Sequence, residues 1–120
     1  SQGRFGTDVY TLTLNKIESP IINTDPFYEI IDGKAVEGKN LILRSWHKGD
    51  IFQPLGMVGH KKVSDFLIDE KVNRFSKMQQ LVLTANDEII WICGRRLGDL
   101  AKITDSTTEY LELYLEPGVG

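Results

Sequence analysis

Residues 80–93, QLVLTANDEIIWIC, contain two apolar runs separated by Asn86-Asp87, and they give the strongest indication of the fold class. Residues 80–85 and 88–93 are each predicted to be strands. The two residues between them predict a hairpin, although the strongest turn pairs carry glycine in second place. Because residues 89–93 are apolar at every position, we expect their strand to lie centrally in a sheet, covered on both faces, with Trp91 in the core.

Further strands are predicted on both sides of this hairpin. In residues 9–14, VYTLTL, alternation places Leu12 and Leu14 on one face, which is the period of two typical of a strand. The other predicted strands are residues 27–31, 41–46 and 110–115.

One segment follows the helical period instead. Within residues 61–71, Val63, Phe66, Leu67 and Glu70 fall on one side of a predicted helix, and residues 75–79 add a short turn. The sequence therefore predicts an α+β fold, a mostly antiparallel, layered or sandwich-like β-sheet with one main helix.

Composition restricts the class of protein. The 120 residues leave room for one core, and no stretch approaches the roughly 20 apolar residues of a membrane helix, so no membrane partner is expected. The first six residues lack the apolar core of a signal peptide and are interpreted as an irregular tail. The single cysteine, Cys93, is expected to be buried and inert, and with two histidines in the chain no metal site is expected. The cytoplasm is the expected location.

The charge of the chain is unevenly distributed. The net charge is −3, whereas a nucleic-acid-binding domain is usually basic. Residues 44–102, however, hold ten Lys and Arg against seven Asp and Glu, so this segment is positive and the remainder is negative. The distribution permits a basic face, and an ordinary mixed surface is the alternative.

A glycine-containing loop precedes the predicted helix. Gly56 and Gly59 allow tight turns, and His60, Lys61 and Lys62 would place positive charge at a helix start, where backbone N–H groups favour an anion. The pattern fits one phosphate of a nucleic-acid backbone. A solvated Lys-Lys pair is the alternative, and a nucleotide phosphate loop, Gly-x-x-x-x-Gly-Lys-Ser/Thr, does not occur.

Other polar residues give weaker signals. Asp65 and Asp69 are expected to solvate the helix and to pair with Lys61 or Lys62 rather than to act in catalysis. Arg95-Arg96 would either hold phosphate or form a surface pair with no partner. His47 and Trp46 are candidates for a polar and a stacking contact to RNA.

Five blocks of sequence, in order, form a pattern: residues 43–50 (LRSWHKGD), 54–66 (PLGMVGHKKVSDF), 69–72 (DEKV), 90–97 (IWICGRRL) and 102–104 (KIT). Together they resemble the C-terminal domain of bacterial tRNA(Ile)-lysidine synthetases, which has an Arg, a Gly-Asp, a Pro-Leu-Gly and a Lys-Lys before a Ser-Asp-Phe helix. One stretch departs from the family, since residues 98–101 (GDLA) stand where the family has Asp-Asp/Glu-Arg-Phe.

The resemblance implies a fold similar to part of the phenylalanyl-tRNA synthetase β-subunit, with residues 1–35 as a lead-in of one or two strands and residues 36–120 as the C-terminal domain. It implies a parent ligase that uses ATP to attach lysine to the wobble cytidine of tRNA(Ile). ATP would bind the parent's N-terminal domain through a Ser-Gly-Gly-x-Asp-Ser loop. This chain lacks that loop, so we expect no cofactor and no catalysis in it. The implied partners are the acceptor-stem side of tRNA(Ile) and the parent's own catalytic domain, and a homodimer is left open.

The resemblance also assigns roles to residues, and we expect the RNA contacts to converge on one positive face. Ser64 and Phe66 would seat the helix. The alternative is a protein-interaction or structural domain that keeps the fold and has lost RNA binding. The implied RNA contacts are Arg44, Lys48, His60, Lys61, Lys62, Arg95 and Arg96, and the implied loop-shaping residues are Gly49, Asp50, Pro54, Gly56 and Gly59.

Overall fold

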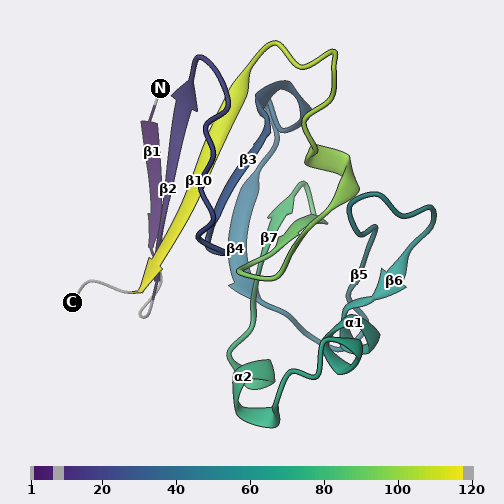
Figure 1. The fold of residues 1–120 in the computed structure, drawn as a ribbon. Helices are drawn as coiled ribbons and strands as arrows, with labels where there is room; N and C mark the ends of the chain where they lie inside the picture. Colours follow the sequence, from purple (N-terminus) through teal and green to yellow (C-terminus); the bar gives the residue numbers. More distant parts are fainter. Residues whose placement is uncertain (1, 7–9, 118–120) are drawn as a thin grey trace. The chain divides into compact units, whose positions relative to one another are not determined.

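The chain groups into two compact units (Figure 1). The computed structural model describes residues 2–6 and 10–117. One unit combines residues 1–38 with 101–120, and the other spans residues 39–100. The C-terminal strand returns to pair with the N-terminal strands, so the two ends of the chain form one unit together, and the expectation of a single core stays a prediction. The domain boundary predicted near residue 36 stays a prediction.

The first unit is built on a four-stranded antiparallel sheet in the order β1-β2-β10-β3. The predicted strands near residues 9–14, 27–31 and 110–115 are confirmed, although Val9 lies outside the described residues. The interpretation of the first residues as an irregular tail is wrong, because β1 pairs with β2. The strands are β1 (Gln2–Gly6), β2 (Tyr10–Ile17), β3 (Tyr28–Asp32) and β10 (Tyr110–Pro117), and η1 (Gly33–Ala35) follows β3.

The two faces of this sheet differ in polarity. Leu14 lies opposite Leu113, and both are buried. On the other face, the Tyr28 hydroxyl donates to Glu112 at 2.6 Å and the Asn15 amide donates to the same carboxylate at 3.0 Å. Burial, then the hydrogen bond to Glu112, raise the pKa of Tyr28. The sheet thus follows the alternation on which the β2 prediction depended.

The second unit contains a four-stranded antiparallel sheet in the order β4-β7-β8-β9, and its hairpin is the predicted one. Asn86 and Asp87 join β7 to β8 with φ values of 48° and 70°, the left-handed conformation that a two-residue hairpin turn requires. Residues 89–93 are all buried, which confirms the doubly covered central strand. The strands are β4 (Leu41–Ser45), β7 (Leu81–Ala85), β8 (Glu88–Ile92) and β9 (Arg96–Leu97), followed by η2 (Asp99–Ala101).

The helix of the second unit is shorter than predicted. Helix α1 is Val63–Asp69 rather than residues 61–71, because β6 (Lys61–Lys62) pairs with β5 (Ile51–Phe52) as an extended ribbon. At the other end, Lys71 has a φ of 56°, which lies outside the right-handed helical region. A second helix, α2 (Arg74–Met78), forms where a short turn was predicted.

Helix α1 and the β5–β6 ribbon pack on one face of this sheet. Phe66, predicted to face the core, is 7% exposed and makes an edge-on ring contact with Phe52, with centroids 5.3 Å apart. Glu70 is exposed, so its predicted place on the buried side is wrong. The remaining members of the cluster are Val63, Leu67, Val82, Ile89 and Ile92.

Candidate nucleic-acid interface

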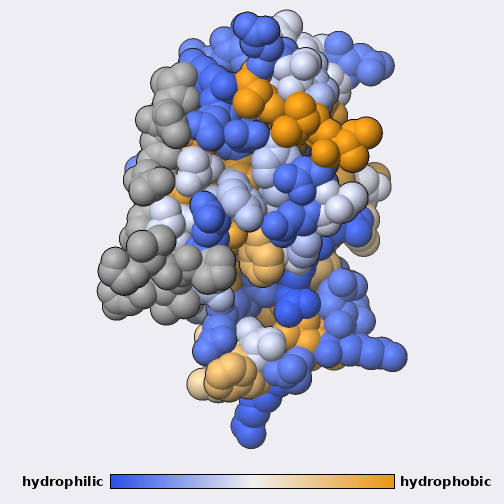
Figure 2. All heavy atoms as spheres, turned by 60° about the vertical axis from the view of Figure 1, so that its left-hand side comes forward, coloured by the Kyte–Doolittle hydropathy of each residue, from blue (hydrophilic) through white to orange (hydrophobic). Residues whose placement is uncertain are grey.

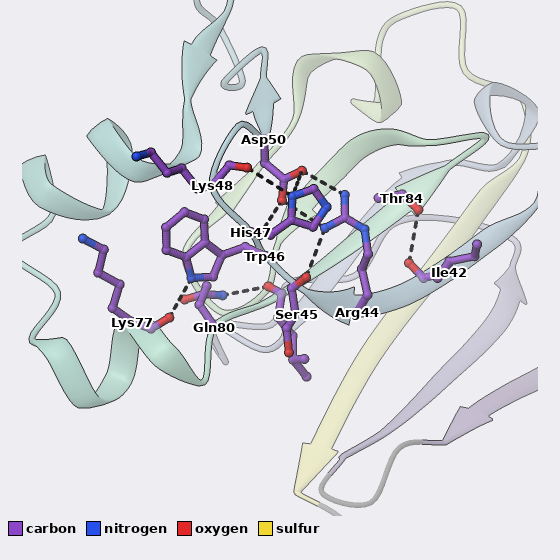
Figure 3. Close-up of polar contacts among 11 residues, drawn as sticks. Ile42, Arg44, Ser45, Trp46, His47, Lys48, Asp50, Lys77, Gln80 and Thr84 are labelled. Carbon is purple, nitrogen blue, oxygen red and sulfur yellow. Dashed lines mark hydrogen bonds and ion pairs between the residues drawn. The ribbon is translucent and has the colours of Figure 1, made fainter.

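Arg44, predicted to contact RNA, is held by a carboxylate of its own chain. Its two terminal nitrogens, Nη1 and Nη2, donate to the two oxygens of Asp50 at 2.9 and 3.0 Å (Figure 3). The Asp50 side chain is only 7% exposed, whereas that of Arg44 is 29% exposed, so the carboxylate is shielded from water and the guanidinium partly so. A fork of this kind fixes direction as well as distance. The Arg44–Asp50 pair therefore ties β4 to the start of β5.

Asp50 also shapes the turn that follows β4. The backbone N–H of His47 donates to Asp50 Oδ2 at 2.8 Å, and Gly49 has a φ of 100°. Burial alone would raise the pKa of Asp50, but hydrogen bonds from Arg44 and the His47 amide, with the charge of Arg44, hold it below its ordinary value. Asp50 is thus ionised at neutral pH and orders residues 47–50.

Beside this turn, Trp46 joins β4 to α2. Its indole N–H donates to the carbonyl oxygen of Lys77 at 2.7 Å, and the Lys77 ammonium lies 5.9 Å from the indole centroid. Figure 3 shows the side chains of Lys48 and Lys77 extending to the same side of this ring. Half-buried Trp46 thus has its N–H edge and one ring face engaged, which leaves less of it for the predicted RNA stacking contact.

The base of the loop at residues 53–60 is fastened to the segment after β8. Arg96 Nη2 donates to the Leu55 carbonyl oxygen at 2.8 Å, and the Gly56 N–H donates to Asp99 Oδ1 at 3.0 Å. The Asp99 N–H donates to the Gln53 carbonyl oxygen at 2.8 Å. Asp99, in the stretch that departs from the family pattern, is therefore part of the loop's support.

The tip of the same loop is exposed. Gly56 and Gly59, two of the predicted shaping residues, have φ values of 78° and 85°, and nothing lies within 4 Å of a Cβ built on either. Between them, Met57 and Val58 are 46% and 101% exposed. The loop thus presents apolar side chains on a fixed base, while Pro54, predicted to shape it, is buried in a bridge to Gly98.

The cations of the ribbon lie ahead of the helix rather than on it. Lys61 forms an ion pair with Asp69 of α1, which confirms the predicted pairing. Lys62 is the exposed N-cap residue of α1 and contributes no side-chain cap. Residues 60–62 therefore lead directly into the start of α1, and an anion site there stays a prediction.

Each arginine after β8 has a partner, so the alternative of an unpaired surface pair is wrong. Arg95 Nε donates to Gln80 Oε1 at 2.7 Å, and Arg96 is the donor to Leu55. Both side chains remain exposed, and a guanidinium has five N–H donors, so several donors of each are free to face solvent.

Two of the predicted contacts lie on one face of the sheet. Arg44 pairs with Val82, Val82 with Ile92, and Ile92 with Arg96, so the four residues form a single cross-strand row. Residues paired in this way point to the same face. Three strand spacings separate the arginines by about 14 Å at the backbone, and the buried middle of the row faces α1. The two arginines thus hold the two ends of residues 50–55.

Lys48 and Lys62 differ from the predicted RNA contacts whose side chains have partners in the chain, which are Arg44, Lys61, Arg95 and Arg96. In the described part of the chain, 2–6 and 10–117, neither side chain has an ion pair or a hydrogen bond, and the same is true of His60. His60 shares a hollow of about 490 Å³ with Asp87 and Glu88, so its surroundings carry both signs of charge. The freest cations near the loop are therefore Lys48 and Lys62.

Some residues were missed at the sequence level. Lys77 lies with its ammonium over the indole ring of Trp46. The sequence feature that could have pointed to it is the run of residues 71–79, which holds three cations and no acidic residue. Asp99 gave no such signal, because its partner is a backbone N–H of a loop 43 residues away in sequence.

Several other classes of site receive no support among the described residues. No group of three or more His, Cys, Asp or Glu side chains in that part of the chain is placed to hold a metal ion. No helix there is long and apolar enough to span a membrane. Cys93 is buried as predicted, and burial raises the pKa of its thiol, which makes it a poor nucleophile.

The antiparallel α+β architecture and the loop held by arginines define a class of small β-rich domain, and comparison with known proteins identifies the family. Residues 41–113 match the family model described as "TilS substrate C-terminal domain". The chain belongs to this family, which confirms the resemblance.

Curated relatives are several times longer than the region they share with this chain. A tRNA(Ile)-lysidine synthase of Parabacteroides distasonis is 41% identical over 71 residues, which is 59% of this chain and 16% of that protein. One of Caldanaerobacter subterraneus subsp. tengcongensis is 28% identical over 102 residues, or 85% of this chain and 21% of that protein. The chain thus matches between about a sixth and a fifth of their length.

A solved structure shares the fold. The crystal structure of a TILS C-terminal domain superposes with a TM-score of 0.74, covering 92% of this chain and 86% of that one at 19% identity. The predicted fold class, α+β with mostly antiparallel sheets, is therefore confirmed.

Proposed function

We propose that this chain is the noncatalytic tRNA-binding domain of a tRNA(Ile)-lysidine synthase. Its partners would be the acceptor-stem side of tRNA(Ile) and the catalytic domain of the same enzyme. That domain would bind ATP and attach lysine to the wobble cytidine in the cytoplasm. Family membership supports this reading, because the curated relatives are named tRNA(Ile)-lysidine synthases. The isolated chain should neither hydrolyse ATP nor form lysidine, since its sequence holds no nucleotide phosphate loop.

The observation that carries the proposal is a supported loop with free cations at its flanks. The Arg44–Asp50 pair and the Arg96 contact fix residues 50–55, while Lys48 and Lys62 are exposed. Lysines held on a preordered frame reach phosphates without the cost of ordering the backbone. An A-form stem offers phosphates and 2′-hydroxyls to such a surface more readily than base edges. Binding should therefore be driven by shape and charge.

The experiment is a salt titration of RNA binding to the 120-residue chain. Unmodified tRNA(Ile) transcript is titrated by fluorescence anisotropy between about 50 and 200 mM salt. Each phosphate contact contributes about 0.9 to the slope of log affinity against log salt. Lys48→Ala and Lys62→Ala should each lower that slope by about one, while Lys34→Ala, which alters an exposed lysine of the first unit, should leave it unchanged. Equal slopes for all four proteins would contradict the proposal.

A protein-interaction domain is the second candidate, and the exposed tip of the loop favours it. Met57 and Val58 are apolar and have little cover, as noted above. Figure 2 shows that the face of the molecule in this view is mostly hydrophilic, with hydrophobic residues gathered in patches. If the tip docks on protein, Val58→Ser abolishes that contact and leaves the salt slope of RNA binding unchanged.

A further inference from the structure

Helix α2 carries an exposed aromatic among cations, and no role has been assigned to it so far. Phe75 is 69% exposed and Met78 is 75% exposed. Three residues apart on a helix, they lie on one side of it and form a continuous apolar surface. Figure 2 shows hydrophobic atoms among hydrophilic ones at the lower end of the molecule, where Figure 1 places α2.

The charges around this surface are positive. Residues 71–79 contain Lys71, Arg74 and Lys77 and no acidic residue. The acids just before them are Asp69, whose carboxylate pairs with Lys61, and Glu70. Arg74 is exposed, and its side chain has no ion pair or hydrogen bond within residues 2–6 and 10–117. The surface thus combines an aromatic face with an excess of positive charge.

The helix itself is held firmly despite its five residues. The Asn73 side chain caps the helix by accepting a hydrogen bond from the Ser76 N–H at 2.8 Å. The indole N–H of Trp46 donates to the Lys77 carbonyl oxygen. Because the helix is fixed on the side away from solvent, Phe75 and Met78 stay exposed rather than folding inward. Lys77 of this helix lies over the Trp46 ring, and Figure 3 shows its side chain extending to the same side of that ring as Lys48, a lysine of the proposed tRNA interface.

We propose that α2 is a stacking platform for an unpaired nucleotide that adjoins a double-stranded RNA stem. Phe75 stacks on the base, Met78 covers the edge of the stacked ring, and Arg74 and Lys71 contact the flanking phosphates. Aromatic side chains bind unpaired bases irrespective of sequence, whereas bases within a stem are stacked on one another. The charge favours RNA over a protein partner, because an apolar docking face is usually depleted of lysine. This proposal rests on the proposed tRNA binding and assigns it a second subsite.

The test uses two RNA hairpins that share one stem, one blunt and one with an unpaired 3′ extension of a few nucleotides. The parent chain should bind the extended hairpin about tenfold more tightly, as expected for stacking of one base. Phe75→Leu keeps an apolar side chain and removes the aromatic face, so it should lose most of that gain while binding the blunt hairpin as before. Phe75→Trp should retain the gain. Arg74→Gln should lower the salt slope only for the extended hairpin.

The outcomes separate the platform from the proposed function. Failure to bind either hairpin would contradict the proposed function, tRNA binding, itself. Binding of the blunt hairpin with no gain from the extension would overturn only the platform, and so would a gain that survives in Phe75→Leu. Self-association of the parent chain that Phe75→Asp abolishes, without any effect of the extension, would assign the face to a second copy of the chain. Unchanged tryptophan emission in the Phe75→Leu, Phe75→Asp and Arg74→Gln variants would show that Trp46, which lies against α2, keeps its surroundings. The Phe75→Trp variant adds an indole of its own, so thermal unfolding checks that one.

Discussion

The guanidinium of Arg44 and the carboxylate of Asp50 form a two-pronged hydrogen bond, with N–O distances of 2.9 and 3.0 Å, across the turn between β4 and β5. Arg44 Nη1 also donates a third hydrogen bond, to the Ser45 carbonyl oxygen at 3.0 Å, so the guanidinium is engaged further within its own chain. An arginine so engaged holds the turn in place, and we expect this to be its main contribution to the proposed RNA binding. Lys48, two residues before Asp50, is the cation that this turn presents to solvent.

We expect Arg44→Lys to destabilise the chain while leaving the salt slope of tRNA binding nearly unchanged. Lysine keeps the charge but cannot form the fork, so the free energy of unfolding should fall by about 1.5–3 kcal/mol, as measured by urea unfolding. A double-mutant cycle with Asp50→Asn should give strongly non-additive losses. A slope lowered by about one with stability unchanged would instead make Arg44 a phosphate contact.

The same pair predicts how stability depends on pH. The pKa of Asp50 is lower in the folded chain than its ordinary value, so its contribution is fully present above the unfolded pKa of about 3.9. That contribution is lost as the pH falls through the folded pKa. Asp50→Asn should therefore be less stable than the parent at pH 7, and the difference should shrink below about pH 4. Thermal unfolding across that range measures it, and a difference that stays constant down to pH 2 would exclude the pair as its source.

Periodicity and turn chemistry predicted most of the regular structure. The β7–β8 hairpin followed from two apolar runs around Asn86-Asp87, because strand length and turn residues are local properties of the chain. The start of α1 was misplaced for a nonlocal reason. Lys61 and Lys62 have ordinary helix propensity, but pairing with Ile51 and Phe52 holds them extended.

The candidate site was predictable as a set of residues but not as a set of contacts. Family blocks pointed to Arg44, Arg95 and Arg96, yet a sequence does not show that each guanidinium has a partner in its own chain. The exposed position of Phe75 was equally hidden, because a five-residue helix gives too short a pattern to tell its buried side from its exposed side.

The core beneath the loop should be sensitive to truncation at Phe66. Its ring is 7% exposed and packs edge-on against Phe52, so Phe66→Ala should lower the free energy of unfolding by about 3–5 kcal/mol. Ile68 lies on the same helix and is 61% exposed, which makes Ile68→Ala a matched control with a change below about 0.5 kcal/mol. Chemical denaturation of the two variants gives the comparison. Equal losses would mean that α1 does not bury Phe66 in solution.

A side chain at Gly98 should be destabilising, because the backbone of β8 lies close to this position. A Cβ at this position would lie 3.1 Å from the carbonyl oxygens of both Ile89 and Ile90, and neither is a flexible group that can move aside. The Gly98 N–H also donates to the Ile90 carbonyl oxygen at 2.7 Å, so the close approach is fixed by a hydrogen bond. Gly98→Ala should therefore cost about 1–3 kcal/mol of stability, the range expected for overpacking.

Gly33→Ala is the matched control for Gly98→Ala. A Cβ at Gly33 would meet its nearest neighbour, Glu109 Cβ, only at 3.4 Å, which is the edge of ordinary van der Waals contact. That variant should lie within about 0.5 kcal/mol of the parent. Since the Gly98 segment also anchors the loop through Asp99, Gly98→Ala should weaken tRNA binding without changing its salt slope. Thermal unfolding and the anisotropy titration test this prediction. A Gly98→Ala variant with the stability and the tRNA affinity of the parent would show that neither depends on the close approach of the Gly98 segment to β8.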